Sequence, residues 1–292
     1  MLNIFRSAAA SMLLATMMVA GVAALSHAAV LFENGFETDI SGWDVFGGGF
    51  NATRVSSGTN GITSSAGGFH AETATAAGNW GGYGFNAGCA STGCAAGAFQ
   101  DYKTSVDIFL DLGGGWADNT RFDFSSAINR PDGNHRRDFI FNAAFFGSGD
   151  ATGPGAGTDR FVISASNNSQ PGSAYAKNPD KAPIAIDASG WYTFMHRFYD
   201  DGGVLAVDMT IMDSGNNAVN SWTLSDPTDL IPAEIGGNRY GWFAFNEFSV
   251  LAFDQTSLET IEAEEVPEPA TLALFAIGLA GLGVARRRKS AA

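Results

Sequence analysis

The sequence has 292 residues, with 30 acidic side chains, 16 basic side chains and a net charge of −14. Five of the basic residues lie near the two ends of the chain, so the region between them is more acidic still. It lacks the basic surface that binding to nucleic acid requires. Glycine (37 residues) and phenylalanine (23 residues) are abundant, which is typical of short strands joined by tight turns.

The first segment of the chain has the composition of a secretory signal peptide. One early arginine precedes an apolar run over residues 8–25, and small residues follow at Ser26 and Ala28. We expect cleavage between Ala28 and Ala29, so that residues 1–28 are removed on export. An N-terminal membrane anchor is the alternative, because the apolar run is long enough for one.

The exported region opens with a predicted strand, a turn and a second strand, over Leu31–Glu37 and the residues from Ser41 to Trp43. Its Asn-Gly-Phe-Glu and Gly-Trp steps resemble the N-terminal strands of secreted jelly-roll carbohydrate-binding modules. Residues 47–97 are then rich in Gly, Ala, Ser and Thr, which predicts short strands and long loops.

The two cysteines of the chain, Cys89 and Cys94, lie in this Gly-rich region. Outside the cytoplasm, two cysteines so close in sequence are expected to form a disulfide. Closing so short a loop stabilises the fold by about 2 kcal/mol at most. We therefore expect a local clip rather than a disulfide framework.

Alternation of apolar and polar residues becomes regular from Val106 onward. Strands are predicted over 106–112, 121–129, 138–146, 160–166, 191–199, 204–212 and 218–224. Residues 239–254 are predicted as one long strand or a pair of strands. Residues 131–134 predict a turn, 167–183 a polar loop, and 213–217 the clearest hairpin. With no amphipathic helix and no repeat, the pattern predicts an all-β fold, a two-sheet antiparallel β-sandwich of the jelly-roll kind spanning residues 29–258.

The stretch from Gly190 to Leu224 also resembles concanavalin-type and laminin-G-like sandwiches. It contains a Trp-Tyr strand, the polar turn Asp200–Gly203, an alternating strand, a hairpin and the strand of Trp222. The resemblance implies the architecture and does not specify a ligand.

No catalytic residues are predicted. A retaining glycosidase needs two carboxylates about 5 Å apart, and Glu72 and Glu247 each stand alone in their segments. His70, His135 and His196 lack the paired spacing of a zinc site. His196 shares a strand face with aromatic residues, so we expect it in the core.

Calcium is the one cofactor that the sequence suggests, as a structural ion. Asp200 and Asp201 bring oxygen atoms together in a turn, as do residues 132–134 and 226–229. Such clusters also serve as ordinary turn residues, which is the alternative interpretation.

Tryptophan is the better indication of a ligand. An exposed indole can stack on a sugar ring, although most tryptophans of a sandwich fill the core. Trp80, Tyr83 and Trp116 lie in Gly-rich contexts and are the predicted sugar-binding residues.

The C-terminal region has three parts: an acidic stalk with a Pro-Glu-Pro step (259–269), an uncharged apolar run (270–285) and a basic tail (286–292). As a helix the apolar run is about 24 Å long, short of the roughly 30 Å hydrocarbon core but enough for a marginal span. The basic tail predicts a cytoplasmic end. A buried C-terminal helix is the alternative, although the run has no polar face.

These features together resemble a PEP-CTERM sorting signal. The motif residues are Val266, Pro267, Glu268 and Pro269, and the basic residues after the span are Arg286, Arg287, Arg288 and Lys289. The resemblance implies recognition and cleavage by an exosortase, after transient anchoring in the inner membrane of a Gram-negative-type bacterium. It implies nothing about the region that precedes it.

The sequence thus predicts an exported surface or matrix protein whose non-catalytic sandwich binds extracellular polysaccharide. Two alternatives stay open. One is a glycoside hydrolase or polysaccharide lyase on the same fold, and the other is a purely structural component of the extracellular matrix.

Overall fold

The computed structural model describes residues 29–46, 52–73, 80–83, 98–167, 176–237 and 239–261. At residues 44–46, 80, 81, 83, 239, 240 and 242 it describes the backbone alone. The expected signal peptide, the two cysteines and the C-terminal segment from residue 262 lie outside these residues. Within the described ranges, no helix is both long and apolar enough to cross a membrane.

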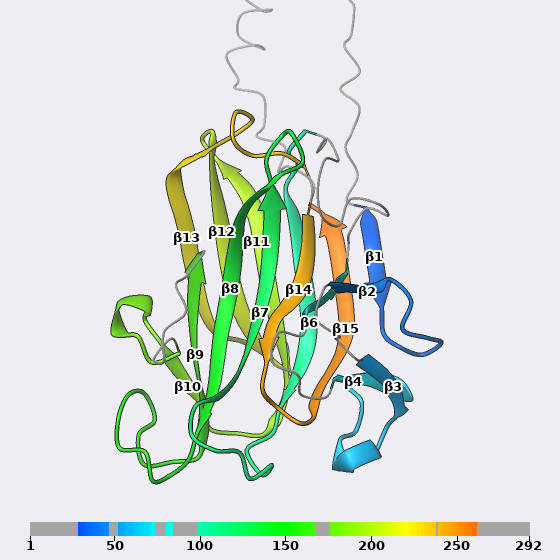
Figure 1. Ribbon diagram of the computed structural model, residues 1–292, viewed down its shortest axis with the longest axis vertical. Coiled ribbons are helices and arrows are strands. Elements are labelled where there is room, and N and C mark those ends of the chain that lie inside the picture. Colours follow the sequence, from blue (N-terminus) through cyan, green and yellow to red (C-terminus); the bar gives the residue numbers. More distant parts are fainter. Residues whose placement is uncertain are drawn as a thin grey trace, which may run out of the picture.

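Two antiparallel sheets form a β-sandwich, as the sequence predicted (Figure 1). Sheet A contains, in order, β13 (Ala218–Leu230), β12 (Val204–Asp213), β11 (Gly190–Asp201), β6 (Tyr102–Leu110), β15 (Leu251–Thr260), β4 (Phe69–Thr73) and β3 (Ala52–Ser56), and β1 (Val30–Asn34) also pairs with β15. Sheet B contains β10 (Ile184–Ile186), β9 (Arg160–Asn167), β8 (His135–Phe146), β7 (Thr120–Asn129), β14 (Arg239–Asn246), β5 (Trp80–Tyr83) and β2 (Trp43–Phe46). Two 3₁₀ turns, η1 (Thr59–Gly61) and η2 (Pro179–Lys181), lie in loops.

Phenylalanine rings fill the space between the sheets. Side chains of β6 are buried at every second position, which places one face of the strand in the core. The ring of Phe194 in sheet A meets Phe122 and Phe141 of sheet B edge-on, with centroids 5.8 and 5.2 Å apart. Each buried phenylalanine contributes about 1.5–3 kcal/mol relative to an exposed one, so these rings hold the sheets together.

The last strand is longer than the sequence predicted. β15 continues to Thr260, past the domain boundary expected at residue 258. Glu259 lies in this strand and pairs with Lys103 of β6 at 2.9 Å, so it belongs to the sheet rather than to the acidic stalk.

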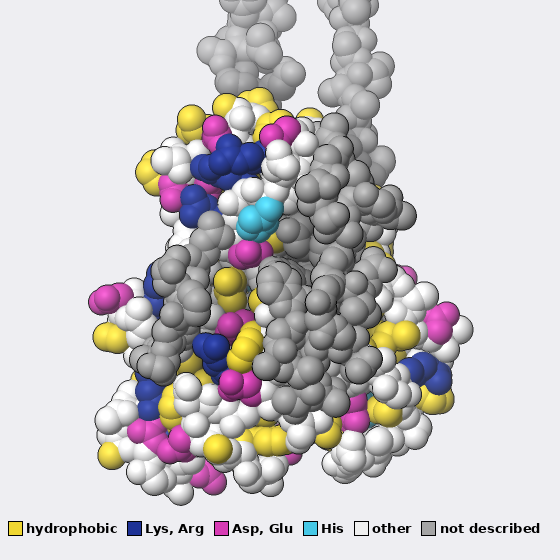
Figure 2. Space-filling model, viewed as in Figure 1, with side chains coloured by type: hydrophobic (Ala, Val, Ile, Leu, Met, Phe, Trp, Pro, Cys, Tyr) yellow, Lys and Arg dark blue, Asp and Glu magenta, His cyan; other side chains and the backbone are white. Residues whose placement is uncertain are grey.

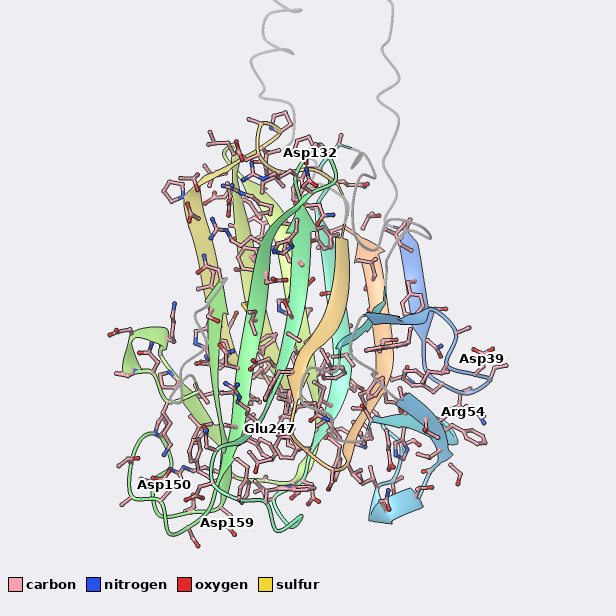
Figure 3. All side chains as sticks on the ribbon, in the orientation of Figure 1. Asp39, Arg54, Asp132, Asp150, Asp159 and Glu247 are labelled. Carbon is pink, nitrogen blue, oxygen red and sulfur yellow. The ribbon has the colours of Figure 1, made fainter. Side chains whose placement is uncertain are left out.

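The strands run between two ends of the sandwich, which we call the terminal end and the distal end. Residues 29 and 261 lie at the terminal end, where the backbone N–H of Ala29 donates to Thr260 Oγ1 at 2.8 Å. Figure 3 marks the terminal end by Asp132, in the β7–β8 turn, and the distal end by Asp150 and Asp159. The loops 111–119, 147–159 and 247–250 and the β12–β13 hairpin lie at the distal end.

Arginine and aspartate side chains join the two sheets at the terminal end. The Nε atoms of Arg136 and Arg137 in β8 donate to the two carboxylate oxygens of Asp229 in β13, at 2.7 and 2.5 Å. Asp229 is fully buried, and Asp226 accepts from Arg137 at 2.9 Å. We call these four residues the arginine clamp. Figure 2 shows Lys and Arg side chains gathered beside acidic ones at this end.

Candidate functional site

Several predicted site residues lie outside the described part of the chain, and for them the sequence interpretation stays a prediction. They are Cys89, Cys94, Val266, Pro267, Glu268, Pro269, Arg286, Arg287, Arg288 and Lys289.

Trp80 and Tyr83 begin and end strand β5, where the sequence predicted a Gly-rich loop context. This short strand pairs with β2 on one side and with β14 on the other. Only their backbone is described, so the sugar-binding role of these two side chains stays a prediction.

Trp116 lies in the loop between β6 and β7 and is half-buried. Its Nε1 donates to the backbone oxygen of Asp111 at 2.8 Å, and its ring meets the buried ring of Phe248 edge-on at 5.1 Å. Trp116 therefore helps to close the distal end of the core, which leaves only part of its indole for a ligand.

The aspartates considered for calcium act in turns. Asp200 Oδ1 accepts from the backbone N–H of Gly203 at 2.6 Å, and Asp201 is exposed at the end of β11. Asp132 and Asp226 likewise accept from N–H groups two residues ahead. Among the residues that the structure describes, no group of three or more acidic, histidine or cysteine side chains is placed to hold a metal ion.

His196 lies in the core, as expected from its strand face. It is fully buried beside the rings of Phe124 and Phe141, and its Nε2 lies 3.0 Å from the backbone oxygen of Phe139. Burial lowers the pKa of His196 to about 3, so the imidazole is neutral at physiological pH. Its environment makes it part of the core rather than an accessible acid or base.

One concave site among the described residues lies on the outer face of sheet A, near the distal end. It has a volume of about 230 Å³, and we call it the Trp191 hollow. Its lining residues come from β6, β11, β15, the β3–β4 loop and the β12–β13 hairpin: Ser65, Ala66, Asp107, Trp191, Thr193, Asp213, Ser214, Asn216 and Gln255.

The indole of Trp191 is held in a fixed orientation. Its Nε1 donates to the backbone oxygen of Thr63 at 2.7 Å. The rings of Phe109 and His70 meet it edge-on, with centroids 5.4 and 5.9 Å away. Because Trp191 remains half-buried rather than enclosed, a held aromatic surface borders the hollow.

The β3–β4 loop is secured over sheet A by backbone and side-chain hydrogen bonds. The carboxylate of Glu37 accepts from the backbone N–H groups of Gly68 and Phe69 at 3.0 and 3.1 Å. Gly67 has φ +64, and a Cβ there would collide with the carboxylate of Glu37. The loop thereby brings Ser65 to the hollow.

Two carboxylates lie side by side at the base of the site, because Asp254 of β15 pairs in register with Asp107 of β6. Asp107 accepts from Ser65 Oγ at 2.5 Å and from Thr193 Oγ1 at 2.6 Å. Asp254 is fully buried and accepts from the backbone N–H groups of Ser65 and Gln255 at 3.1 and 2.8 Å. Burial, with a further contribution from the charge of Asp107, raises the pKa of Asp254 from 3.8 to about 6.

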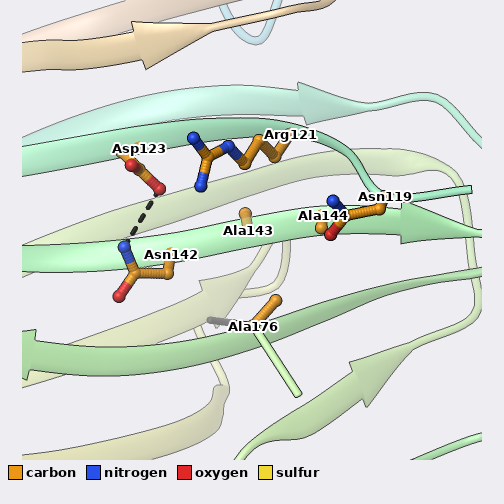
Figure 4. Close-up of a pocket in the computed structure, with 7 residues that line it drawn as sticks. All are labelled: Asn119, Arg121, Asp123, Asn142, Ala143, Ala144 and Ala176. Carbon is orange, nitrogen blue, oxygen red and sulfur yellow. Dashed lines mark hydrogen bonds between the residues drawn. The ribbon is translucent and has the colours of Figure 1, made fainter. Parts of the chain in front are cut away.

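A second, shallower polar site lies on the outer face of sheet B (Figure 4). Asn142 Nδ2 donates to Asp123 Oδ1 at 3.0 Å, and Asn142 Oδ1 accepts from Ser166 Oγ at 2.8 Å. Burial raises the pKa of Asp123, and the hydrogen bond from Asn142 opposes that change. This chain of bonds satisfies buried polar groups of the sheet, and it offers no aromatic surface among its described lining residues.

The sequence interpretation missed the Trp191 hollow. Asp107 is one of the polar residues of the predicted strand 106–112, and Trp191 is not among the predicted sugar-binding residues. The available signal was the row of polar residues on the outer face, where Thr193, Asp107 and Asp254 occupy paired positions of three strands. That row can be recognised only when the strand order is known.

A sequence-family comparison identifies a PEP-CTERM protein-sorting motif at residues 265–289. The match confirms the resemblance found in the tail. It implies export, a processed C-terminal membrane anchor and sorting by an exosortase, and it covers none of the described sandwich. Comparison with curated proteins gives no match.

Solved structures with similar strand arrangements include several lectins. Basic winged bean lectin, in a complex with Tn-antigen, has a TM-score of 0.43 and 12% identity, with 81% of this chain and 99% of the lectin covered. The Lotus tetragonolobus seed lectin has a TM-score of 0.43 and 12% identity (80% and 99% covered). The CBM2 module of the evolved Dit protein of Lactobacillus casei BL23 phage J-1 has a TM-score of 0.38 and 9% identity (81% and 97% covered). Likeness at this level carries no argument about the ligand.

Proposed function

We propose that this chain, which carries a PEP-CTERM sorting motif, is an exported surface or matrix protein whose sandwich binds extracellular polysaccharide at the Trp191 hollow. The observation that carries the proposal is the indole of Trp191, fixed beside hydroxyl, amide and carboxylate groups that line one concavity. Binding sites for small molecules typically combine such an apolar surface with a few convergent polar groups.

The chemistry of a sugar ring fits this lining. A pyranose has an apolar face of C–H groups, which can pack on an indole, and a rim of hydroxyls that donate and accept hydrogen bonds. Thr193, Asn216 and Gln255 supply groups of both kinds at the wall of the hollow. Because Trp191 is already held by its own contacts, little conformational entropy is lost when a ligand stacks on it.

The hydrogen bonding and burial of Asp107 and Asp254 favour binding over catalysis. Asp107 and Asp254 both accept hydrogen bonds from the surrounding fold, and Asp254 has no exposed surface. A general acid or a nucleophile must instead reach the reacting sugar.

A glycoside hydrolase is the second candidate, because two adjacent carboxylates with one pKa near 6 are the kind of pair that such enzymes use. Shortening of the polysaccharide on incubation with the protein would support the hydrolase.

The position of the hollow suits a protein held at a membrane by its C-terminal segment. Thr260, the last residue of β15, is at the terminal end, and Asp254 of the same strand lies beneath the hollow. The hollow therefore lies toward the end of sheet A that is opposite residue 261.

The test is calorimetric titration of the purified protein with the exopolysaccharide of its own host, with calcium and again with EDTA. For Trp191→Ala we expect at least a tenfold loss of affinity, about 1.4 kcal/mol, because the stacking surface is removed. Tyr199→Ala is the matched control, since Tyr199 lies on the same face of β11 near the terminal end. Equal affinities for Trp191→Ala and wild type would overturn the proposal, and loss of binding in EDTA alone would support the calcium hypothesis.

A further inference from the structure

We infer that the Trp191 hollow selects sugars that carry a protonated amino group over neutral sugars and over uronic acids. This inference rests on the proposed function and names the class of polysaccharide that the same site would take. It is drawn from the charges that line the hollow and from the way the nearest cations are already paired.

Acidic groups line the hollow without a basic partner. Asp107 and Asp213 are lining residues, and Asp254 lies directly beneath. Among the described residues that line it, none is a lysine, an arginine or a histidine. Since carboxylates repel a uronic acid and attract an ammonium group, the sign of the local charge sets the preference.

Two cations on the same outer face of sheet A, Lys103 and Arg197, are engaged elsewhere. Lys103 pairs with Glu259 at 2.9 Å, and Arg197 pairs with Asp208 at 3.6 Å. Both pairs lie toward the terminal end of the face, several residues along the strands from Asp107. They therefore leave the negative charge of the hollow uncompensated.

The charge of Asp213 also affects a neighbouring titratable group, the hydroxyl of Tyr192. The hydroxyl of Tyr192, opposite Asp213 in the sheet, has a raised pKa, first because of burial and then because of the charges of Asp187 and Asp213. Asp213, a lining residue of the hollow, is thus one contributor to the negative potential at the distal end of β11.

The carboxylate of Asp107 has capacity for a ligand. Each of its oxygens accepts one hydrogen bond from the protein, Oδ1 from Thr193 and Oδ2 from Ser65. A carboxylate oxygen has two lone-pair sites, so one site on each oxygen remains. An ammonium group has three donors and is also attracted to the face of an indole, which Trp191 provides in the same hollow.

The experiment compares three tetrasaccharides with the full protein by calorimetry at pH 5.5: β-1,4-linked glucosamine, its fully N-acetylated form, and β-1,4-linked glucuronic acid. We expect glucosamine to bind at least tenfold more tightly than the acetylated form, and the uronic acid to give no measurable binding. Asp107→Asn should reduce the affinity for glucosamine at least fivefold and that for the acetylated form less than twofold. Asp208→Asn is the matched control, because it removes a carboxylate from the same face outside the hollow.

Each alternative outcome has a separate meaning. Equal binding of glucosamine and its acetylated form, with both weakened by Trp191→Ala, would overturn the selectivity and leave the proposed function standing. Binding of glucosamine that Asp208→Asn weakens as much as Asp107→Asn would show attraction to the acidic surface in general, and would also overturn it. Affinities unaffected by Trp191→Ala would overturn the proposed function itself.

Discussion

At the terminal end, the arginine clamp sets two guanidinium groups against Asp226 and Asp229, whereas the Trp191 hollow near the distal end sets Asp107 beside Asp254 with no described cation in its lining. The clamp uses side chains from strands of two different sheets, whereas the hollow uses side chains from neighbouring strands of one sheet. In the clamp the opposite charges neutralise one another and join sheet B to sheet A. In the hollow like charges remain together in one sheet.

The difference separates a cluster that holds the fold together from the cluster at which we propose that a ligand binds. A buried carboxylate costs free energy unless cations or donors compensate it, and in the clamp that compensation is complete within the protein. In the hollow, N–H and O–H donors compensate the carboxylates only in part. The raised pKa of Asp254 shows that its negative charge is still unfavourable there. A cationic ligand would complete that compensation.

The largest expected effect comes from breaking the clamp with Asp229→Asn. The guanidinium groups of Arg136 and Arg137 are nearly buried, with 12% and 13% of their side-chain surface exposed, and they would lose their shared anion. We expect the free energy of unfolding in urea to fall by about 3–5 kcal/mol. The half-exposed Asp208→Asn is the control, and a loss below about 1 kcal/mol for Asp229→Asn would contradict the central role of the clamp.

A smaller effect is expected on the titration of Asp254. Its folded-state pKa of about 6 exceeds the ordinary 3.8, so its contribution to stability is fully present below about pH 4 and is lost as the pH rises through about 6. In Asp107→Asn the pKa of Asp254 should move down while staying above 3.8, because burial is the larger cause. Carbon-detected NMR titration of the aspartate carboxyls measures this, and an unchanged pKa would show that the two groups do not interact.

The smallest effect is expected at the rim of the clamp. Arg130 donates to Glu234 at 2.5 Å, but their side chains are 40% and 35% exposed, and Arg136 also reaches Glu234, at 3.2 Å. Arg130→Ala should therefore lower the free energy of unfolding by less than about 1 kcal/mol. A loss comparable to that of Asp229→Asn would mean that the rim and the buried pairs act as one network.

Much of the sandwich could be predicted because its signals are local. The turn at residues 131–134 and the hairpin at 213–217 carry Asp, Asn and Gly side chains in the positions that turns require, and both join the expected strands. In β6, alternation identified the inner face. The run Arg239–Asp254 proved to be two strands in different sheets, β14 and β15, as one reading of it allowed.

The hollow could not be predicted because its parts meet only through the order of the strands. Asp107, Trp191 and Asp254 come from β6, β11 and β15, which are adjacent in sheet A and far apart in the chain. Ser65 reaches them from a loop whose path depends on Glu37. Composition drew attention to Trp116 instead, although packing against Phe248 covers part of its ring.

Strand β15 connects the base of the hollow to the residue at which the C-terminal segment begins. If the hollow binds a polymer, as we propose, and the C-terminal segment holds the chain at a membrane, tension runs lengthwise along this strand. Its hydrogen bonds to β6 on one side, and to β4 and β1 on the other, are then loaded in shear and together, rather than peeled apart one by one. The pairing of β15 on both of its edges would thus resist a pulling force applied along its length.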